Sequence, residues 1–149
     1  MQHTDIHTLG LPPIDQIGFV VRDLDAAIER YAPMFGPFST MDGPVEAADF
    51  RGATCDVELK LAFGHTGEVE IELIQWLSGS SPHSEFIQAG REGIHHIRFN
   101  VGDCDAWIER VAAIGYAPIW YKYLVEREMK FAYLERADDP LLIEFIQMP

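Results

Sequence analysis

Four side chains able to bind a metal ion or move a proton occupy duplicated positions in this chain of 149 residues. Gln16 and His96 form one duplicated pair, and Glu72 and Glu144 form the other. One amide oxygen, one imidazole and two carboxylates suit a divalent cation such as Zn, Ni, Co, Mn or Mg. The set predicts a site for one divalent metal ion, with positions left open to water or substrate.

The positions are duplicated because two stretches of sequence occur twice. IDQIGFVVRDLDAAIERY (14–31) and IHHIRFNVGDCDAWIERV (94–111) share 10 of 18 residues without a gap, where about one identity is expected by chance. EIELIQ (70–75) and LIEFIQ (142–147) share 4 of 6. A repeat of this length predicts two similar modules related by a pseudo-twofold axis, so that the four polar side chains converge.

Each copy begins with a strand pattern of period 2, followed by apolar residues at helical spacing after the expected N-caps Asp23 and Asp103. The predicted organisation is one domain with an N-terminal tail (1–13), a first βαβββ module (14–77), a linker with one short helix (78–93) and a second βαβββ module (94–149). The expected fold class is α+β. The two tandem modules form a half-closed, cup-shaped mixed sheet, with the helices on its convex side.

Composition excludes several classes of partner. The net charge of −13 argues against binding to nucleic acid or to anionic membrane surfaces, because both require a basic face. Cys55 and Cys104 are isolated thiols, so neither a disulfide nor a thiolate metal site is expected. The chain has no run of about 18 apolar residues and no signal-peptide pattern. We therefore expect a cytoplasmic protein.

The duplicated strings, with SPHSEFIQAGREGIHHI (81–97), resemble the vicinal oxygen chelate superfamily, which includes glyoxalase I, bleomycin-resistance proteins, extradiol dioxygenases and methylmalonyl-CoA epimerase. The linker most resembles the epimerase branch. The resemblance implies metal ligation by Gln16, Glu72, His96 and Glu144, stabilisation of an enolate, and a homodimer. Epimerases usually have His at the position of Gln16, whereas some glyoxalases I have Gln there.

The predicted activity is that of a metal-dependent epimerase or isomerase, which removes a proton next to a chelated carbonyl. Glu144 is the expected base, and Glu72 is the opposing acid–base group or a plain ligand. Arg98 follows His96 on the same strand face and is expected to meet a substrate carboxylate or phosphate. An internal salt bridge from Arg98 to Glu72 or Glu144 is the alternative. His95 is interpreted as structural.

The substrate is expected to be a small molecule, either an acyl-CoA or an aromatic compound. Asn100 shares the strand face of His96, and Tyr121 and Tyr123 belong to an aromatic-rich pair of strands, so all three are candidates for substrate binding. Two alternatives stay open: a glyoxalase I-like lyase acting on a hemithioacetal, and a metal-free binding protein of the same fold. An iron dioxygenase is disfavoured because it requires a second histidine ligand.

Overall fold

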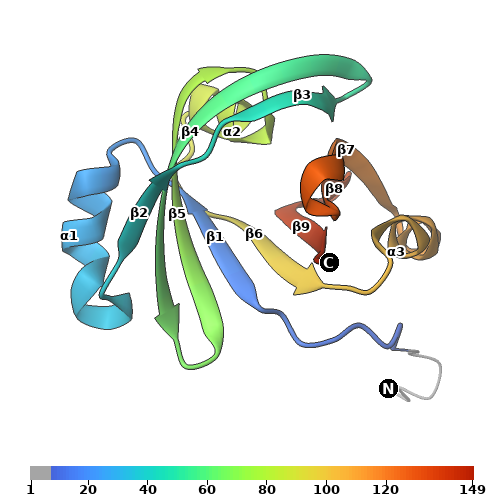
Figure 1. Ribbon diagram of the computed structural model, residues 1–149, viewed down its shortest axis with the longest axis horizontal. Coiled ribbons are helices and arrows are strands. Elements are labelled where there is room, and N and C mark those ends of the chain that lie inside the picture. Colours follow the sequence, from blue (N-terminus) through green and yellow to red (C-terminus); the bar gives the residue numbers. More distant parts are fainter. Residues whose placement is uncertain (1–7) are drawn as a thin grey trace.

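The computed structural model describes residues 8–149 and contains, in that range, one sheet of nine strands flanked by three helices (Figure 1). The strands are β1 (Gln16–Val20), β2 (Ser39–Asp42), β3 (Val45–Phe50), β4 (Ala53–Thr66), β5 (Val69–Gly79), β6 (Gly93–Asn100), β7 (Tyr116–Leu124), β8 (Met129–Arg136) and β9 (Asp139–Gln147). The helices are α1 (Leu24–Phe35), α2 (Pro82–Gln88) and α3 (Cys104–Val111), with single 3₁₀ turns at η1 (Ala112–Ile114) and η2 (Val125–Arg127).

The sheet curves until it closes on itself. Its strand order is β2-β4-β3-β7-β8-β9-β6-β1-β5, and β4 also pairs with β5, so every strand except β2 belongs to a closed ring. The closing seam between β3 and β7 has only two registered pairs, Asp49 with Tyr121 and Phe50 with Trp120. The expectation of a half-closed cup is therefore corrected. Three strands were expected after the first helix, whereas the structure has four, and the additional pairing of β3 with β7 closes the ring.

The centre of the sheet positions the four duplicated residues. β1 and β6 pair antiparallel to each other, β5 runs parallel to β1, and β9 runs parallel to β6. Gly18 on β1 lies in register with both Glu72 on β5 and His96 on β6. Because side chains alternate along a strand, Glu72 shares the inner face of its strand with Ile74, which belongs to the interior core.

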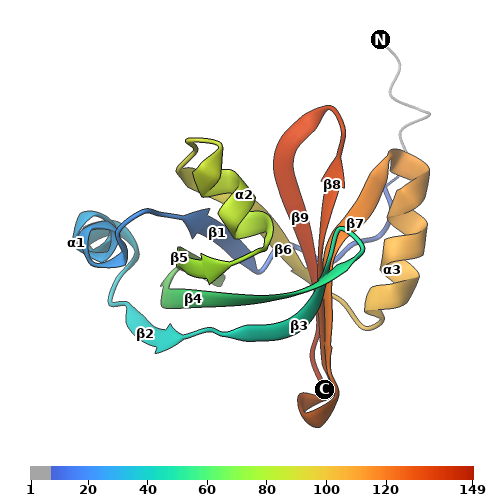
Figure 2. The same cartoon turned by 90° about the horizontal axis from the view of Figure 1, so that it is seen from above.

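Helices α1 and α3 cover the outer face of the ring, as expected, whereas α2 packs against the interior core. Ile71 and Leu73 of β5 pack outward with α1, and Ile143 and Phe145 of β9 pack outward with α3. Figure 2 shows α1 and α3 on opposite flanks of the sheet, with α2 between them. The short helix α2 adds Phe86 to the interior core.

The helix starts follow the sequence signals. The side chains of Asp23 and Asp103 accept hydrogen bonds from the backbone N–H of Ala26 (3.1 Å) and Ala106 (3.0 Å), so both predicted N-caps are confirmed. The first seven residues of the expected tail lie outside the described residues. Positions 8–15 contain no helix or strand, although Leu9 and Leu11 pack against the core beside α3. In the described range, no helix has the length and apolarity needed to cross a membrane.

Candidate metal and proton-transfer site

The four duplicated residues converge on the inner face of the sheet. We call Gln16, Glu72, His96 and Glu144 the His96 cluster. Gln16 Oε1 lies 3.2 Å from His96 Nε2, Glu144 Oε1 lies 3.3 Å from it, and Glu72 Oε1 lies 3.6 Å from it. All four side chains are buried, and His96 is fully so. Strand alternation and the pairing of β9, β6, β1 and β5 explain this convergence.

The orientation of the Gln16 amide is fixed by a neighbour. Gln16 Nε2 donates a hydrogen bond of 2.7 Å to Glu70 Oε1, which turns the amide oxygen toward His96. Glu70 lies on β5, two residues before Glu72, and is half-buried. The amide therefore presents an acceptor atom, rather than its NH₂ group, to the centre of the cluster.

A second hydrogen-bond chain favours one tautomer of His96. His95 Nε2 lies 3.3 Å from the carbonyl oxygen of Pro82, which can only accept, so this nitrogen carries the proton. His95 Nδ1 then accepts a hydrogen bond of 3.0 Å from His96 Nδ1. In this tautomer, which is the one that can ligate a cation, His96 Nε2 is unprotonated and its lone pair faces the oxygens of the cluster. The other tautomer would instead donate from Nε2 to Gln16 Oε1. His95 is structural, as expected, and its structural role is to orient His96.

This donor set fits a divalent cation. Ligand atoms that share a Zn²⁺ ion at about 2.0–2.2 Å lie roughly 3.0–3.6 Å from one another, which is the range of the three separations from His96 Nε2. A histidine that donates its other N–H to a fixed partner is also typical of metal ligands. Among residues 8–149, no three His, Cys, Asp or Glu side chains by themselves have an arrangement that could hold a metal ion. The fit therefore depends on the mixed set, which includes the Gln16 amide.

Burial controls the protonation of the cluster. Burial, with the neighbouring charge of Glu144, raises the pKa of Glu72 to about 8. Burial likewise raises the pKa of Glu144 to about 8, although the charge of Arg98 opposes this shift. Burial, with the charge of Arg98, lowers the pKa of His96 to about 3. Without a cation the cluster is thus neutral near pH 7, and a cation must displace protons from the carboxyl groups to bind.

These shifts predict how the stability of the metal-free protein depends on pH. Glu72 and Glu144 titrate near 8 in the folded chain and near 4.5 in the unfolded one, so folding binds protons in between and stability falls as pH rises across that window. His96 acts in the opposite sense, but its contribution is complete above pH 6.5. We therefore expect the urea midpoint in EDTA to fall between pH 6.5 and 8.

The control for this prediction removes both titrating groups. The double variant Glu72→Gln/Glu144→Gln is expected to show a flatter midpoint over the same pH range. A midpoint of the unmodified chain that stays constant or rises from pH 6.5 to 8 would show that the two carboxyl groups are already ionised in the metal-free fold.

Gly18 makes room for the His96 ring. A Cβ atom added at Gly18 would overlap this ring, with Cε1 and Nε2 closest and Nδ1 at 2.6 Å. The imidazole therefore lies directly over the backbone of β1 and requires glycine beneath it. Gly18 was not among the residues expected from the sequence, although the repeat contains a signal for it, since Gly18 is aligned with Arg98 of the second copy.

A cavity of about 220 Å³ opens beside the cluster and is lined by Gln16, Glu72 and Glu144. Arg98 also lines it, but its guanidinium is bound to Asp15, at 2.9 Å and 3.2 Å, and lies 3.7 Å from Glu70. Arg98 thus forms an internal salt bridge, as the alternative predicted, but its partner is Asp15 and not Glu72 or Glu144. The role of Arg98 in substrate binding stays a prediction.

The other candidate substrate-binding residues lie away from this cavity. Asn100 is exposed at the end of β6. The hydroxyl of Tyr121 donates a hydrogen bond of 2.9 Å to Asp105 of α3, on the outer face of the sheet. Tyr123 is exposed, with the ammonium group of Lys130 over its ring. The structure does not bring these three residues to the cluster, and their contact with substrate remains an untested prediction.

Sequence reasoning missed a buried network beside the cluster. His83 is fully buried, with Nδ1 3.0 Å from Ser81 Oγ and Nε2 3.0 Å from the Tyr133 hydroxyl. The Tyr133 ring packs against His96 at a centroid distance of 4.7 Å. This packing limits movement of the His96 ring. The only sign of this network in the sequence is His83 in the short helix, which lies outside the repeated segments.

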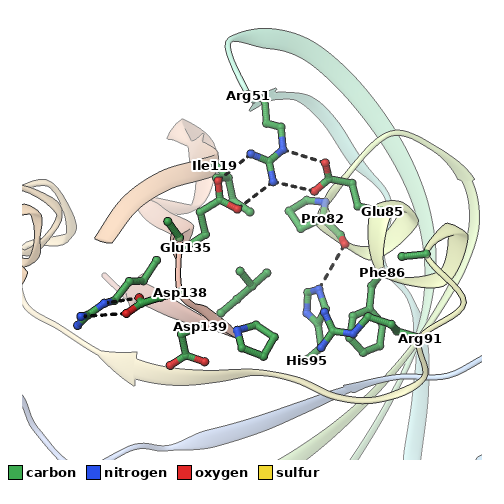
Figure 3. Close-up of a pocket in the computed structure, with 15 residues that line it drawn as sticks. Arg51, Pro82, Glu85, Phe86, Arg91, His95, Ile119, Glu135, Asp138 and Asp139 are labelled. Atoms are coloured by element: carbon green, nitrogen blue, oxygen red, sulfur yellow. Dashed lines mark hydrogen bonds and ion pairs between the residues drawn. The ribbon is translucent and has the colours of Figure 1, made fainter. Parts of the chain in front are cut away.

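A larger cavity of about 750 Å³ lies on the other side of His95 (Figure 3). Arg51, from the turn between β3 and β4, reaches across it and forms bidentate contacts with Glu85 of α2 and Glu135 of β8 at 2.8–3.0 Å. These contacts tie the turn to both neighbours beside the closing seam. Because both carboxylates bind the guanidinium of Arg51, we assign this cavity a structural role and place the proton-transfer reaction at the His96 cluster.

Comparison with known proteins identifies the family of this chain. Residues 15–133 match the model of the Glyoxalase/Bleomycin resistance protein/Dioxygenase superfamily. The chain belongs to this superfamily, which confirms the resemblance expected from the sequence. The superfamily contains epimerases, glyoxalases and dioxygenases, and its members generally bind a divalent metal ion.

Solved structures give the same fold. A hypothetical protein from Bacillus halodurans is 28% identical, with a TM-score of 0.64 over 92% of this chain and 94% of that chain. Methylmalonyl-CoA epimerase from Mycobacterium tuberculosis is 22% identical, with a TM-score of 0.65 over 98% and 94% of the two chains. The Streptomyces coelicolor methylmalonyl-CoA epimerase, in complex with 2-nitronate-propionyl-CoA, is 22% identical, with a TM-score of 0.64 over 93% and 96%. No protein of curated function matches the sequence.

Proposed function

We propose that this protein is a metal-dependent epimerase or isomerase that removes a proton from the carbon next to a carbonyl group. The observation that carries the proposal is the placement of two carboxyl groups around His96. Glu144 comes from β9 and Glu72 from β5, and the strands β6 and β1 lie between them. Two acid–base groups on either side of one centre suit a reaction in which a proton leaves one face of a carbon and returns to the other.

The His96 cluster is the proposed site of one divalent ion, namely Zn, Ni, Co, Mn or Mg. When bound, such a cation supplies positive charge that stabilises negative charge developing on the carbonyl oxygen. Glu144, whose carboxyl group lines the cavity, is the proposed base that removes the proton. Glu72, in its acid form, donates its own proton to the opposite face, so that the step ends with Glu144 protonated and Glu72 ionised, and exchange of protons with water restores both groups. The apolar wall of the cavity excludes water from the carbanion.

Specific observations favour two other activities. The Gln16 oxygen faces the cluster, which supports a glyoxalase I-like lyase acting on a hemithioacetal, because some glyoxalases I have Gln at this position. In the described part of the chain, no group of three His, Cys, Asp or Glu side chains is arranged so that it could hold a metal ion by itself, which supports a metal-free binding protein. The proposal further includes a homodimer, a cytoplasmic location, and one domain with modules at 14–77 and 94–149 after a tail at 1–13, joined by a linker at 78–93.

Metal binding is tested first. The untagged protein, incubated with Zn, Ni, Co or Mn and then desalted, is expected to retain about one equivalent per chain by elemental analysis. His96→Ala is expected to lose it, because His96 Nε2 is the atom on which the three oxygens converge. His65→Ala, which removes an exposed histidine on β4, is the matched control. Equal metal content in the two variants would sink the assignment of the cluster as the metal site.

The reaction is tested with two probes. The metal-loaded protein is incubated in D₂O with methylmalonyl-CoA, the substrate named for the structural neighbours, or with the hemithioacetal of methylglyoxal and glutathione. Deuterium entering the carbon next to the carbonyl of methylmalonyl-CoA, followed by NMR, supports the epimerase. Thioester formation from the hemithioacetal supports the lyase. Bound metal with neither reaction would remove both of these substrates and direct the search to other carbonyl compounds.

A further inference from the structure

The central cavity is small and mostly apolar. Its volume of about 220 Å³ is below the roughly 300–1,000 Å³ typical of pockets for drug-sized ligands. Its wall includes Met41, Leu61, Phe63, Trp120, Leu124 and Phe131. Such a cavity fits a ring-sized apolar group and is too small for a whole coenzyme A molecule.

Two cationic side chains line this cavity, and only one is neutralised by the protein. Arg98 is bound by Asp15 and lies near Glu70. Arg127, in η2 between β7 and β8, is exposed at the opening. In the range 8–149, no carboxylate oxygen lies within the 4.0 Å limit of an ion pair with Arg127, although Glu126 and Glu128 are its neighbours in sequence. Arg127 is therefore available to an anion that enters the cavity.

The balance of charge indicates what kind of anion this is. The chain has a net charge of −13, which repels polyanions at long range. A single guanidinium forms two parallel hydrogen bonds with one carboxylate. One unpaired arginine at the opening of a small apolar cavity thus suits a monoanion better than the several phosphate charges of coenzyme A.

We infer that the cavity takes a small carboxylic acid with a ring-sized apolar body, whose carboxylate is bound by Arg127 at the opening. This inference rests on the proposed function for its site, since a second carbonyl group of the same substrate, separate from the carboxylate, would reach the proton-transfer groups Glu72 and Glu144. It replaces methylmalonyl-CoA by a free acid as the substrate class. Arg127 is then the residue that selects acids over neutral compounds.

The test measures binding without metal, so that a cation cannot hold the carboxylate itself. The full chain is stripped with EDTA and titrated calorimetrically with 3-phenylpropanoate, with its neutral counterpart 3-phenyl-1-propanol, and with coenzyme A. Arg127→Gln removes the charge, and Arg127→Lys keeps it without the bidentate geometry. Arg30→Gln, on the exposed face of α1, is the matched loss of one positive charge.

We expect 3-phenylpropanoate to bind the unmodified chain and Arg30→Gln equally, and Arg127→Gln about tenfold more weakly, with Arg127→Lys between them. The alcohol is expected to bind weakly to all four proteins. The inference is overturned if Arg127→Gln binds the acid as well as the unmodified chain does, or if the alcohol binds as well as the acid. It is also overturned if coenzyme A, rather than the acid, shows the dependence on Arg127.

Metal content measured on the same preparations separates the two proposals. If the unmodified chain retains no metal but binds the acid in a way that depends on Arg127, the proposed metal-dependent enzyme is contradicted and the inferred ligand class is supported. One equivalent of metal, lost in His96→Ala, together with no dependence on Arg127 would leave the proposed function standing and overturn this inference alone.

Discussion

Replacing Glu144 by Gln is expected to slow proton exchange next to the substrate carbonyl by about 10²–10⁴-fold. The amide keeps the shape of the side chain and still offers an oxygen to the cluster, as Gln16 does, but it cannot take up the proton. The change therefore separates the acid–base role of Glu144 from its role in holding the cluster together. Metal content is expected to fall much less than activity.

The measurement uses both enantiomers of a substrate in D₂O and follows the loss of the α-proton of each by NMR. If Glu144 and Glu72 act on opposite faces, Glu144→Gln slows exchange of one enantiomer most, and Glu72→Gln slows exchange of the other. This reciprocal pattern is one that a general loss of structure would not produce. If Glu144→Gln has normal metal content and exchanges the α-proton of both enantiomers at the unmodified rate, Glu144 is not the base.

Gly18→Ala is expected to abolish metal binding, with a loss of affinity of at least about 100-fold. The added methyl group would overlap the imidazole of His96, which is fully buried and held by a hydrogen bond from its Nδ1 to His95 and by packing against Tyr133. The ring can escape only by leaving its place on the floor of the cavity, and the lone pair of Nε2 then no longer faces the three oxygens.

The affinity of Gly18→Ala for Zn is measured by competition with a chelator. Gly102→Ala is the matched control, because an added Cβ there meets no atom within 4 Å. The overlap has a second readout. Removing the ring in Gly18→Ala/His96→Ala is expected to restore thermal stability relative to Gly18→Ala alone. A Gly18→Ala protein that binds Zn like the unmodified chain would show that the ring has room to move.

The convergence of the four duplicated residues was predictable because strand alternation and the sequence repeat both mark it. Alternation along each strand places Glu72 and Glu144 opposite the apolar residues that meet the helices, and the repeat places Gln16 beside His96. The alternation is visible within each strand, and the repeat is visible when segments 14–31 and 94–111 are aligned. The family followed from the same strings of sequence.

The residues around the cavity were harder to predict because they depend on register and on long-range pairing. A register shift in β7 between Pro118 and Trp120 decides which aromatic residues face inward. Trp120 lines the cavity, whereas Tyr121 bonds to α3. A shift of one residue exchanges the two faces of a strand, and no sequence pattern marked it.

The partners that orient the cluster were also beyond the sequence pattern. Asp15 holds Arg98, and Glu70 holds the Gln16 amide, across strands that are adjacent only in the folded sheet. No sequence pattern favours Asp15 over the other carboxylates near Arg98. Only the pairing of β1 with β5 and β6 decides which carboxylate lies within reach.

The position of the closing seam matters for the reacting groups. The ring is joined by only two residue pairs between β3 and β7, whereas the His96 cluster sits on β5, β1, β6 and β9, at the opposite point of the circumference. The reacting groups are thus carried by strands that share five registered pairs with each neighbour in this wall, far from the least paired part of the ring.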